Sequence, residues 1–177
     1  MKISTKDLIL CALFAAISCV LAQISFPLGP VPFTMLVMAI FLAGAILGAK
    51  RGFISQLVYV ILGAIGAPVF SNLHGGIAVV LGPTGGFIIA FPFMALITGY
   101  FADKYKSKGY IVLGMLIGLI FCYAVGAAWL SYAAKMPFIN ALKVGVLPFI
   151  IFDIIKLIIA AVIGINIRTR LAKSGLA

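Results

Sequence analysis

The sequence has 177 residues, of which 65% are hydrophobic and only 9% are charged. Soluble domains have about 45–50% apolar and about 25% charged residues, so this composition excludes an ordinary soluble protein. The net charge of +10 comes from short clusters of lysine and arginine between apolar runs, which argues against nucleic-acid binding. One histidine, and three cysteines inside apolar runs, provide neither metal-site spacing nor a disulfide framework.

Six apolar runs are expected to form transmembrane helices: residues 8–24, 33–48, 52–65, 86–101, 110–130 and 144–167. A helix needs about 20 residues to cross the hydrocarbon core, so the second, third and fourth runs are short. The first run follows Lys2 and Lys6 as a signal peptide would, but it is long for a signal core, and we expect it to be retained. The sequence therefore predicts an all-α integral membrane protein of six transmembrane helices, with residues 1–177 forming a single domain.

Small residues recur at four-residue spacing in the first helix, as Ala12 with Ala16 and as Ser18 with Ala22. This spacing allows the backbone of another helix to approach closely. From the spacing alone, two interpretations stay open. The small residues form either a docking face for another protein or an ordinary packing face inside this protein's own bundle.

Residues 23–34 contain Pro27, Pro30 and Pro32. Proline lacks a backbone donor and clashes with the preceding helical turn, so this stretch is expected to be a short, stiff, uncharged connection. In the third helix, Gln56 and Tyr59 are three residues apart and share one face. They either line a polar cavity or bond to a neighbouring helix.

A long connection, residues 66–85, separates the third and fourth helices, and we call it the lid segment. Connections of more than about 12–15 residues are usually functional or disordered, and this apolar one is not expected to be disordered. Its glycines would let backbone N–H groups approach a ligand closely. We expect a structured outer loop that covers a pocket and brings Asn72, His74, Gly75 and Gly76 to a ligand. The alternative is a loop that only covers the helix ends.

The basic residues predict the orientation of the chain. Ten of the thirteen fall at the two termini and in the second and fourth turns, namely Lys2, Lys6, Lys50, Arg51, Lys104, Lys106, Lys108, Arg168, Arg170 and Lys173. Only Lys135 and Lys143 fall on the opposite side, and Lys156 lies within an apolar run. The positive-inside rule then places both termini in the cytoplasm of a cell-membrane protein, with the lid segment outside.

The last helix contains an acid and a base, Asp153 and Lys156, three residues apart and therefore on one face. A charge at the membrane centre costs roughly 2.5–3.5 kcal/mol, and such residues usually have a function. If the helix begins at Val144, Asp153 lies roughly 14 Å along it. We expect the pair to line a pocket open to the outside. The alternative is that the two charges only neutralise each other.

Three stretches together carry a family resemblance: residues 23–34 (QISFPLGPVPFT), the lid segment with Gly75-Gly76 and residues 82–86 (GPTGG), and Asp153-x-x-Lys156. In this order they resemble the BioY family, the biotin-binding S components of energy-coupling-factor (ECF) transporters. The resemblance spans nearly the whole chain. It implies a six-helix, non-enzymatic subunit without a cofactor that binds biotin from outside. It also implies a transmembrane coupling protein and two cytoplasmic ATPases as partners, with Ala12 and Ala16 on the docking face.

The resemblance also gives the site residues a chemical role. The ureido ring of biotin has two N–H donors and one carbonyl, so Asp153 can accept and Lys156 can donate. The acidic tail of biotin would point away from Asp153, toward the lid. The chain departs from the family at His74, where arginine is frequent, and at Leu36, where glutamine is frequent. A neutral histidine holds a carboxylate less firmly than a bidentate arginine does.

Two other functions remain open from the residues. An ion-coupled secondary transporter of a vitamin-like solute would also use an intramembrane acid, although such folds usually contain internal repeats, and none is visible here. An intramembrane enzyme would need a nucleophile or a metal set, and one deep acid with one loop histidine is a poor basis for either. Since no Gly-x-x-x-x-Gly-Lys motif is present, ATP hydrolysis by this chain is not expected.

Overall fold

The computed structural model describes residues 4–27, 29–105 and 107–173. Within these ranges the chain is almost entirely helical, with one short β-hairpin. In chain order the elements are α1 (Thr5–Gln23), β1 (Ser25–Pro27), β2 (Pro32–Thr34), α2 (Leu36–Leu47), α3 (Ala49–Ala64), η1 (Ser71–Leu73), α4 (Ile77–Leu81), α5 (Gly85–Lys104), α6 (Lys108–Ala133), α7 (Phe138–Gly145) and α8 (Ile150–Lys173).

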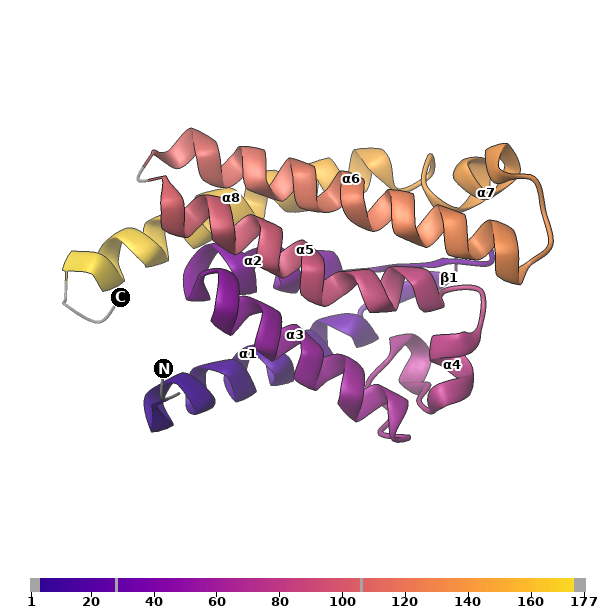
Figure 1. Ribbon diagram of the computed structural model, residues 1–177, viewed down its shortest axis with the longest axis horizontal. Coiled ribbons are helices and arrows are strands. Elements are labelled where there is room, and N and C mark those ends of the chain that lie inside the picture. Colours follow the sequence, from indigo (N-terminus) through magenta and orange to yellow (C-terminus); the bar gives the residue numbers. More distant parts are fainter. Residues whose placement is uncertain (1–3, 28, 106, 174–177) are drawn as a thin grey trace.

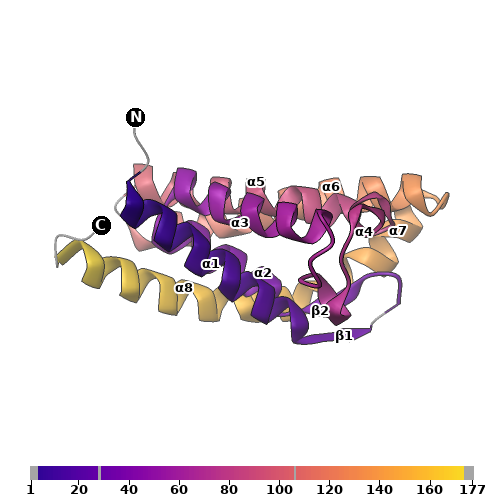
Figure 2. The same cartoon turned by 90° about the horizontal axis from the view of Figure 1, so that it is seen from below.

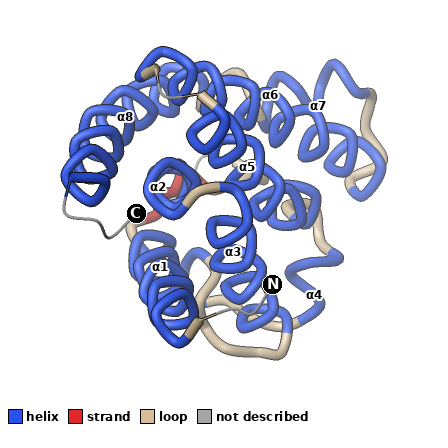
Figure 3. The backbone as a smooth tube through the Cα atoms, turned by 60° about the vertical axis from the view of Figure 1, so that its left-hand side comes forward, coloured by secondary structure: helices blue, strands red, loops and turns tan. Residues whose placement is uncertain are grey.

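The long helices form two layers. Figure 2 shows α3, α5 and α6 in one layer and α1, α2 and α8 in the other. In the end-on view of Figure 3, α2 lies near the centre of the molecule with the other long helices around it. Its residues Ala39, Ile40, Phe41 and Ala43 are fully buried. A helix enclosed in this way is apolar on every side, which explains the uninterrupted apolar run of its sequence.

Glycines bring α5 and α6 into close contact. Gly114, Gly118 and Gly126 lie on one face of α6, at spacings of four and eight residues. A Cβ atom at these positions would collide with Phe101, Met94 and Phe87, respectively, all on α5. Small residues at helix interfaces allow this close approach where no hydrophobic effect drives association. The two helices therefore form a tightly packed pair that supports one wall of the bundle.

The two ends of the bundle differ in charge. The start of α1, the α2–α3 junction, the end of α5, the start of α6 and the end of α8 lie at one end, which we call the basic end (Figure 1). β1, α4 and α7 lie at the other, the hairpin end (Figure 1). Among the predicted basic residues, Lys2 and Lys106 lie outside the described residues, as does the side chain of Lys173. The helix ends at the basic end carry Lys6, Lys50, Arg51, Lys104, Lys108, Arg168 and Arg170.

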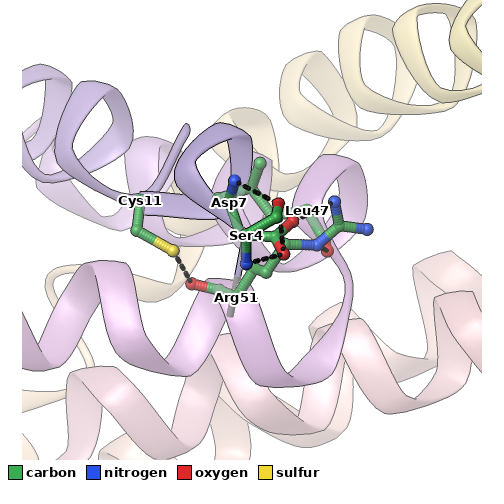
Figure 4. Close-up of polar contacts among 5 residues, drawn as sticks. All are labelled: Ser4, Asp7, Cys11, Leu47 and Arg51. Carbon is green, nitrogen blue, oxygen red and sulfur yellow. Dashed lines mark hydrogen bonds and ion pairs between the residues drawn. The ribbon is translucent and has the colours of Figure 1, made fainter. Parts of the chain in front are cut away.

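Polar contacts tie α1 to the α2–α3 junction at the basic end (Figure 4). Arg51 Nη1 donates to Asp7 Oδ1 at 3.2 Å, and Arg51 Nε donates to the Leu47 carbonyl at 3.0 Å. Ser4 and Asp7 form a reciprocal capping box at the start of α1. The thiol of Cys11 also contacts the Arg51 carbonyl, at 3.4 Å.

A second acid holds the same junction from the other side. Asp103, near the end of α5, accepts from the Ala49 N–H at 2.8 Å and from Arg168 Nη2 at 2.8 Å. Arg168 also donates to the Ala45 carbonyl at 3.0 Å. Asp7 and Asp103, the two acids outside the buried part of α8, therefore both hold the short α2–α3 junction to its neighbours.

The outer surface is apolar. Within the described residues, α1, α5, α6 and the Ile150–Leu171 part of α8 are long and apolar enough to cross a membrane, and α2 is a shorter apolar helix. Large side chains such as Val20, Ile120, Ile151 and Val162 are more than half exposed on these helices. An exposed apolar belt of this kind is matched by a lipid environment. The prediction of an all-α membrane protein is confirmed.

The first connection is a β-hairpin, which the sequence did not predict. β1 and β2 pair antiparallel, with Ser25 opposite Thr34 and Pro27 opposite Pro32. Proline cannot donate to a ladder, so its presence in a two-stranded ribbon requires the outward-facing positions of edge strands. The prolines thus limit the hairpin to three pairs and explain why no strand pattern is recognisable in the sequence.

The lid segment contains short regular elements, η1 and α4, rather than only irregular chain. Asn72 and Leu73 have φ values of 57° and 58°, and Gly76, just before α4, has a φ of 101°. Positive φ is uncommon for residues other than glycine, so the turn at Asn72–Leu73 is held by its surroundings.

The expected start of the last helix at Val144 is wrong. α7 ends at Gly145 and α8 begins at Ile150, with a turn between them that contains Pro148. Proline has no N–H to donate and disfavours the helical conformation of the residue before it, so one continuous helix cannot form here. Asp153 therefore lies in the first turn of α8 and donates its N–H to the Phe149 carbonyl at 2.8 Å.

Candidate functional site

Asp153 and Lys156 form a buried ion pair. Lys156 Nζ lies 2.7 Å from Asp153 Oδ1, and each residue is only 3% exposed. The pair uses the i, i+3 spacing of α8, as the sequence predicted. Asp153 lies near the N-terminus of the helix, where the macrodipole favours a negative charge. Two charges removed from water are stabilised only if further hydrogen bonds use their remaining donors and acceptors. The stability of the pair therefore depends on its other hydrogen-bond partners.

The hairpin supplies the remaining partners of Lys156. The ammonium donates to the Thr34 carbonyl at 2.7 Å and lies 3.8 Å from the centroid of the Phe33 ring. An ammonium has three N–H bonds, and here they meet a carboxylate, a carbonyl and an aromatic face. Phe33 packs edge-on against Phe152 at 5.2 Å between centroids. Lys156 therefore fastens the end of β2 to α8.

Tyr123 is the second side-chain hydrogen-bond donor to Asp153. Its hydroxyl donates to Asp153 Oδ2 at 2.6 Å from α6, on the other side of the site. The sequence analysis missed Tyr123 because it is 30 residues away from Asp153 and shows no local pattern with it. The one available signal was a phenol in the middle of an otherwise apolar span.

The ion pair faces the first of three adjoining cavities. The inner cavity has a volume of about 60 Å³. Its lining includes Leu119, Cys122, Tyr123, Phe149, Asp153 and Lys156. A middle cavity of about 70 Å³ shares Val31, Pro32, Thr34, Phe87 and Phe91 with it. The polar groups of Tyr123, Asp153 and Lys156 thus meet at one end of this series.

The third cavity opens to the molecular surface at the hairpin end, and we call it the mouth cavity. It has a volume of about 400 Å³ and shares Pro32, Ser71, Val79 and Thr84 with the middle cavity. Asn72 and His74, two of the predicted site residues, line it. Asp153 and Lys156 thus lie at one end of a series of cavities, and Asn72 and His74 lie at the other, with Pro32 lining all three cavities.

Asn72 and His74 are exposed and have few polar contacts. Asn72 Oδ1 accepts from the Ser25 hydroxyl at 3.0 Å, which joins the lid segment to the hairpin. His74 Nδ1 lies 2.9 Å from the Ser71 carbonyl. Because a carbonyl only accepts, Nδ1 carries the proton, and Nε2 is the nitrogen that remains for a ligand.

A sequence model of the BioY family matches residues 1–173. The chain belongs to the BioY family. It is 48% identical over 159 residues to a probable biotin transporter BioY of Pyrococcus horikoshii, covering 90% of this chain and 94% of the relative. It is 40% identical over 163 residues to a biotin transporter BioY of Thermotoga maritima, covering 92% and 96%. These matches confirm the family resemblance drawn from the sequence.

A solved structure shares the fold. The crystal structure of the S-component for biotin from an ECF-type ABC transporter matches this BioY-family chain with a TM-score of 0.86. The two chains are 35% identical, and the match covers 93% of this chain and 91% of the other. The chain is therefore a multi-pass membrane protein with the architecture of that S-component.

Gly75 and Gly76 lie apart from the three cavities. Gly76 donates its N–H to the Gly63 carbonyl at 2.7 Å, so this group is already bonded within the protein. A Cβ atom on Gly75 would collide with the Ala67 carbonyl, so glycine is required for the chain to pass there. In this BioY-family chain the two glycines shape the lid segment, and neither lines the cavities described above.

Gln23, the last residue of α1, holds the lid segment in place. Its Nε2 donates to the carbonyls of Val69 and Phe70 at 3.1 and 3.0 Å, and its Oε1 accepts from the Leu73 N–H at 2.9 Å. The Tyr59 hydroxyl adds a bond to the Val69 carbonyl at 3.3 Å, and Tyr59 lines the middle cavity. One amide side chain thus satisfies three backbone groups of the turn that carries Asn72 and His74.

The structure separates the small-residue pairs of α1. Ser18 and Ala22 are fully buried, and Ser18 exchanges hydrogen bonds with Gln56 of α3. Ala12 and Ala16 lie on the opposite, exposed face of the helix. The first pair thus packs within the bundle, and the second leaves a shallow strip on the surface. Among the described residues, no three His, Cys, Asp or Glu side chains group as a metal site.

Proposed function

We propose that this chain is the biotin-binding S component of an ECF-type ABC importer in the cell membrane. The carrying observation is the Tyr123–Asp153–Lys156 group at the inner end of a series of cavities. Buried charges inside a membrane protein are costly, so a group of this kind is expected to recognise a ligand. The names of the relatives and of the matching crystal structure support biotin as that ligand.

The chemistry of biotin fits the arrangement. A ureido N–H can donate to a free lone pair of Asp153, and the ureido carbonyl can replace the Thr34 carbonyl as an acceptor for Lys156. The carboxylate tail is repelled by Asp153 and therefore extends toward the mouth cavity, where His74 and Asn72 lie. The lid segment is the cover of this opening.

We place six membrane spans at α1, α2, α3, α5, α6 and α8. α2 has 12 residues, about 18 Å of helix, which is shorter than a hydrocarbon core of about 30 Å. Because other helices enclose α2, its ends need not reach the lipid headgroups. The basic end then faces the cytoplasm by the positive-inside rule, with both termini there, and the mouth cavity opens outside. Lys135 and Lys143 are the basic residues placed on the outer side.

The exposed strip at Ala12 and Ala16 is the proposed docking face for a transmembrane coupling protein, which works with two cytoplasmic ATPases. Exposed small residues at four-residue spacing let a partner helix approach closely within the membrane. Ala16→Trp should leave biotin binding unchanged and abolish uptake by the assembled importer. Ile120→Trp, on the exposed face of α6, is the matched control and should affect neither. Normal uptake by Ala16→Trp would place the docking face elsewhere.

The ligand assignment is tested by titrating the purified chain with biotin and by mass spectrometry of the ligand that co-purifies with it. Saturable binding at a stoichiometry of one, with biotin in the spectrum, supports the proposal. Uptake by reconstituted chain alone, driven by an ion gradient, would instead support a secondary transporter.

A further inference from the structure

Tyr123 belongs to the polar group of the inner cavity, but the contacts proposed above for the ureido ring use only Asp153 and Lys156. Its hydroxyl donates to one lone pair of Asp153 Oδ2, and the Lys156 ammonium donates to one lone pair of Asp153 Oδ1. A carboxylate oxygen has two lone pairs, so one acceptor position remains on each oxygen. The 2.6 Å separation is typical of a charge-assisted O–H···O⁻ bond, which is shorter and stronger than a neutral one.

The two donors reach Asp153 from different helices. Lys156 lies on α8, as Asp153 does, whereas Tyr123 lies on α6. The terminal torsion of an aspartate has a broad energy minimum, so one donor on one oxygen does not fix the plane of the carboxylate. A second donor on the other oxygen, anchored in the neighbouring helix, does fix it.

We propose that Tyr123 is a positioning residue that sets the specificity of the site for ureido N–H donors. Its hydroxyl orients the Asp153 carboxylate so that the free lone pair of Oδ2 is directed into the inner cavity. The inference rests on the proposed function, since it concerns how the same site recognises its ligand. A site built to hydrogen-bond an N–H rejects an analogue that lacks it, because a buried acceptor is then left unpaired.

The first test measures selectivity. Wild type and Tyr123→Phe are titrated with biotin and with the two cyclic carbamate analogues, in which one ureido N–H or the other is replaced by oxygen. Wild type should reject one carbamate by about 10- to 100-fold, the range expected for a hydrogen bond to a charged group. Tyr123→Phe should weaken biotin about tenfold and leave the affinity for that carbamate nearly unchanged, so that the selectivity ratio falls. A variant that weakens all three ligands equally, or none, overturns the proposal.

The second test asks whether Tyr123 acts through Asp153. In a double-mutant cycle, Tyr123→Phe should change biotin affinity less than about twofold once Asp153→Asn is present, because the two residues are coupled. An equal effect in both backgrounds overturns the proposal. Tyr132→Phe, which removes an exposed hydroxyl from the same helix, is the matched control and should behave as wild type. If wild type does not bind biotin, the proposed function is wrong. If wild type binds biotin and Tyr123→Phe has the same selectivity between biotin and the carbamates as wild type, only this inference is wrong.

Discussion

The inner and mouth cavities form the two ends of one series, yet they are built in opposite ways. In the inner cavity, Asp153 and Lys156 are buried, and their polar groups are bonded to partners from α6, α8 and β2. At the mouth, the side chains of Asn72 and His74 are exposed, and each makes one hydrogen bond. Charge interactions are strong where water is excluded and weak where solvent and salt screen them. Recognition should therefore be concentrated at the inner end, with the mouth contributing a smaller, tunable part.

The largest effect should follow from breaking the inner end. Asp153→Asn leaves the buried Lys156 ammonium without its counter-charge, at a cost of roughly 3–5 kcal/mol in buried sites. Biotin affinity should fall by at least about 100-fold, measured by titration of the folded variant in detergent. Lys156→Ala should have a comparable effect, because it leaves Asp153 unpaired.

The control for this variant is Asp103→Asn. It removes an exposed acid at the basic end of the bundle, which lines none of the three cavities. It should retain wild-type affinity. Near-normal binding by both Asp153→Asn and Lys156→Ala would remove the ion pair from the binding site.

A smaller effect is expected from changing the charge at the mouth. The Nδ1–H of His74 is bonded to the Ser71 carbonyl, so only Nε2 remains for the biotin carboxylate. Arginine presents a planar charged group with several N–H donors, so His74→Arg should bind biotin more tightly than wild type. The gain should be smaller than the factor of roughly 10 to 100 that one charge-assisted bond provides, because the loop is exposed.

A second substitution sharpens the test at the mouth. His74→Ala should bind biotin at most about fivefold more weakly than wild type, because it removes one exposed contact. The three affinities are measured by titration in the same buffer. Equal affinity of wild type, His74→Arg and His74→Ala would leave His74 without a role in binding.

The smallest effect should come from changing the tail of the ligand. Biotin amidated through its carboxylate to lysine keeps the ureido ring and extends into the open mouth cavity. Its affinity should lie within about tenfold of that of biotin, since only a screened contact is lost. A loss as large as that of Asp153→Asn would mean that the mouth, rather than the inner cavity, dominates recognition.

The inner ion pair could be predicted from the sequence because charges are rare in apolar runs, so Asp153 and Lys156 are conspicuous. Tyr123 could not, because its role depends on α6 packing against α8, and a tyrosine in an apolar span is otherwise unremarkable. Hydropathy also located the long helices, because residues in contact with lipid are apolar and charged residues among them stand out. Hydropathy carries no information on backbone geometry, so the effect of Pro148 on the start of α8 was missed.

The lid segment shows a different limit. Its glycines suggested backbone groups free for a ligand, but the N–H of Gly76 is bonded to Gly63. A glycine required for close passage of the chain and a glycine required for ligand contact look identical in one sequence. The hairpin escaped prediction because Pro27 and Pro32 argue against strands in general, though not against three-residue edge strands.

The three bonds of Gln23 to the lid segment have a mechanical consequence. The proposed docking strip lies on α1. The last residue of α1, Gln23, hydrogen-bonds through its side-chain amide to the backbone of Val69, Phe70 and Leu73. The helix α1 thus connects the proposed docking strip to the turn of the lid segment that lines the mouth cavity. We expect a partner that tilts α1 at Ala16 to move the lid segment through Gln23 and through the Ser25–Asn72 bond of the adjoining hairpin. Assembly and opening of the mouth would then be parts of one movement.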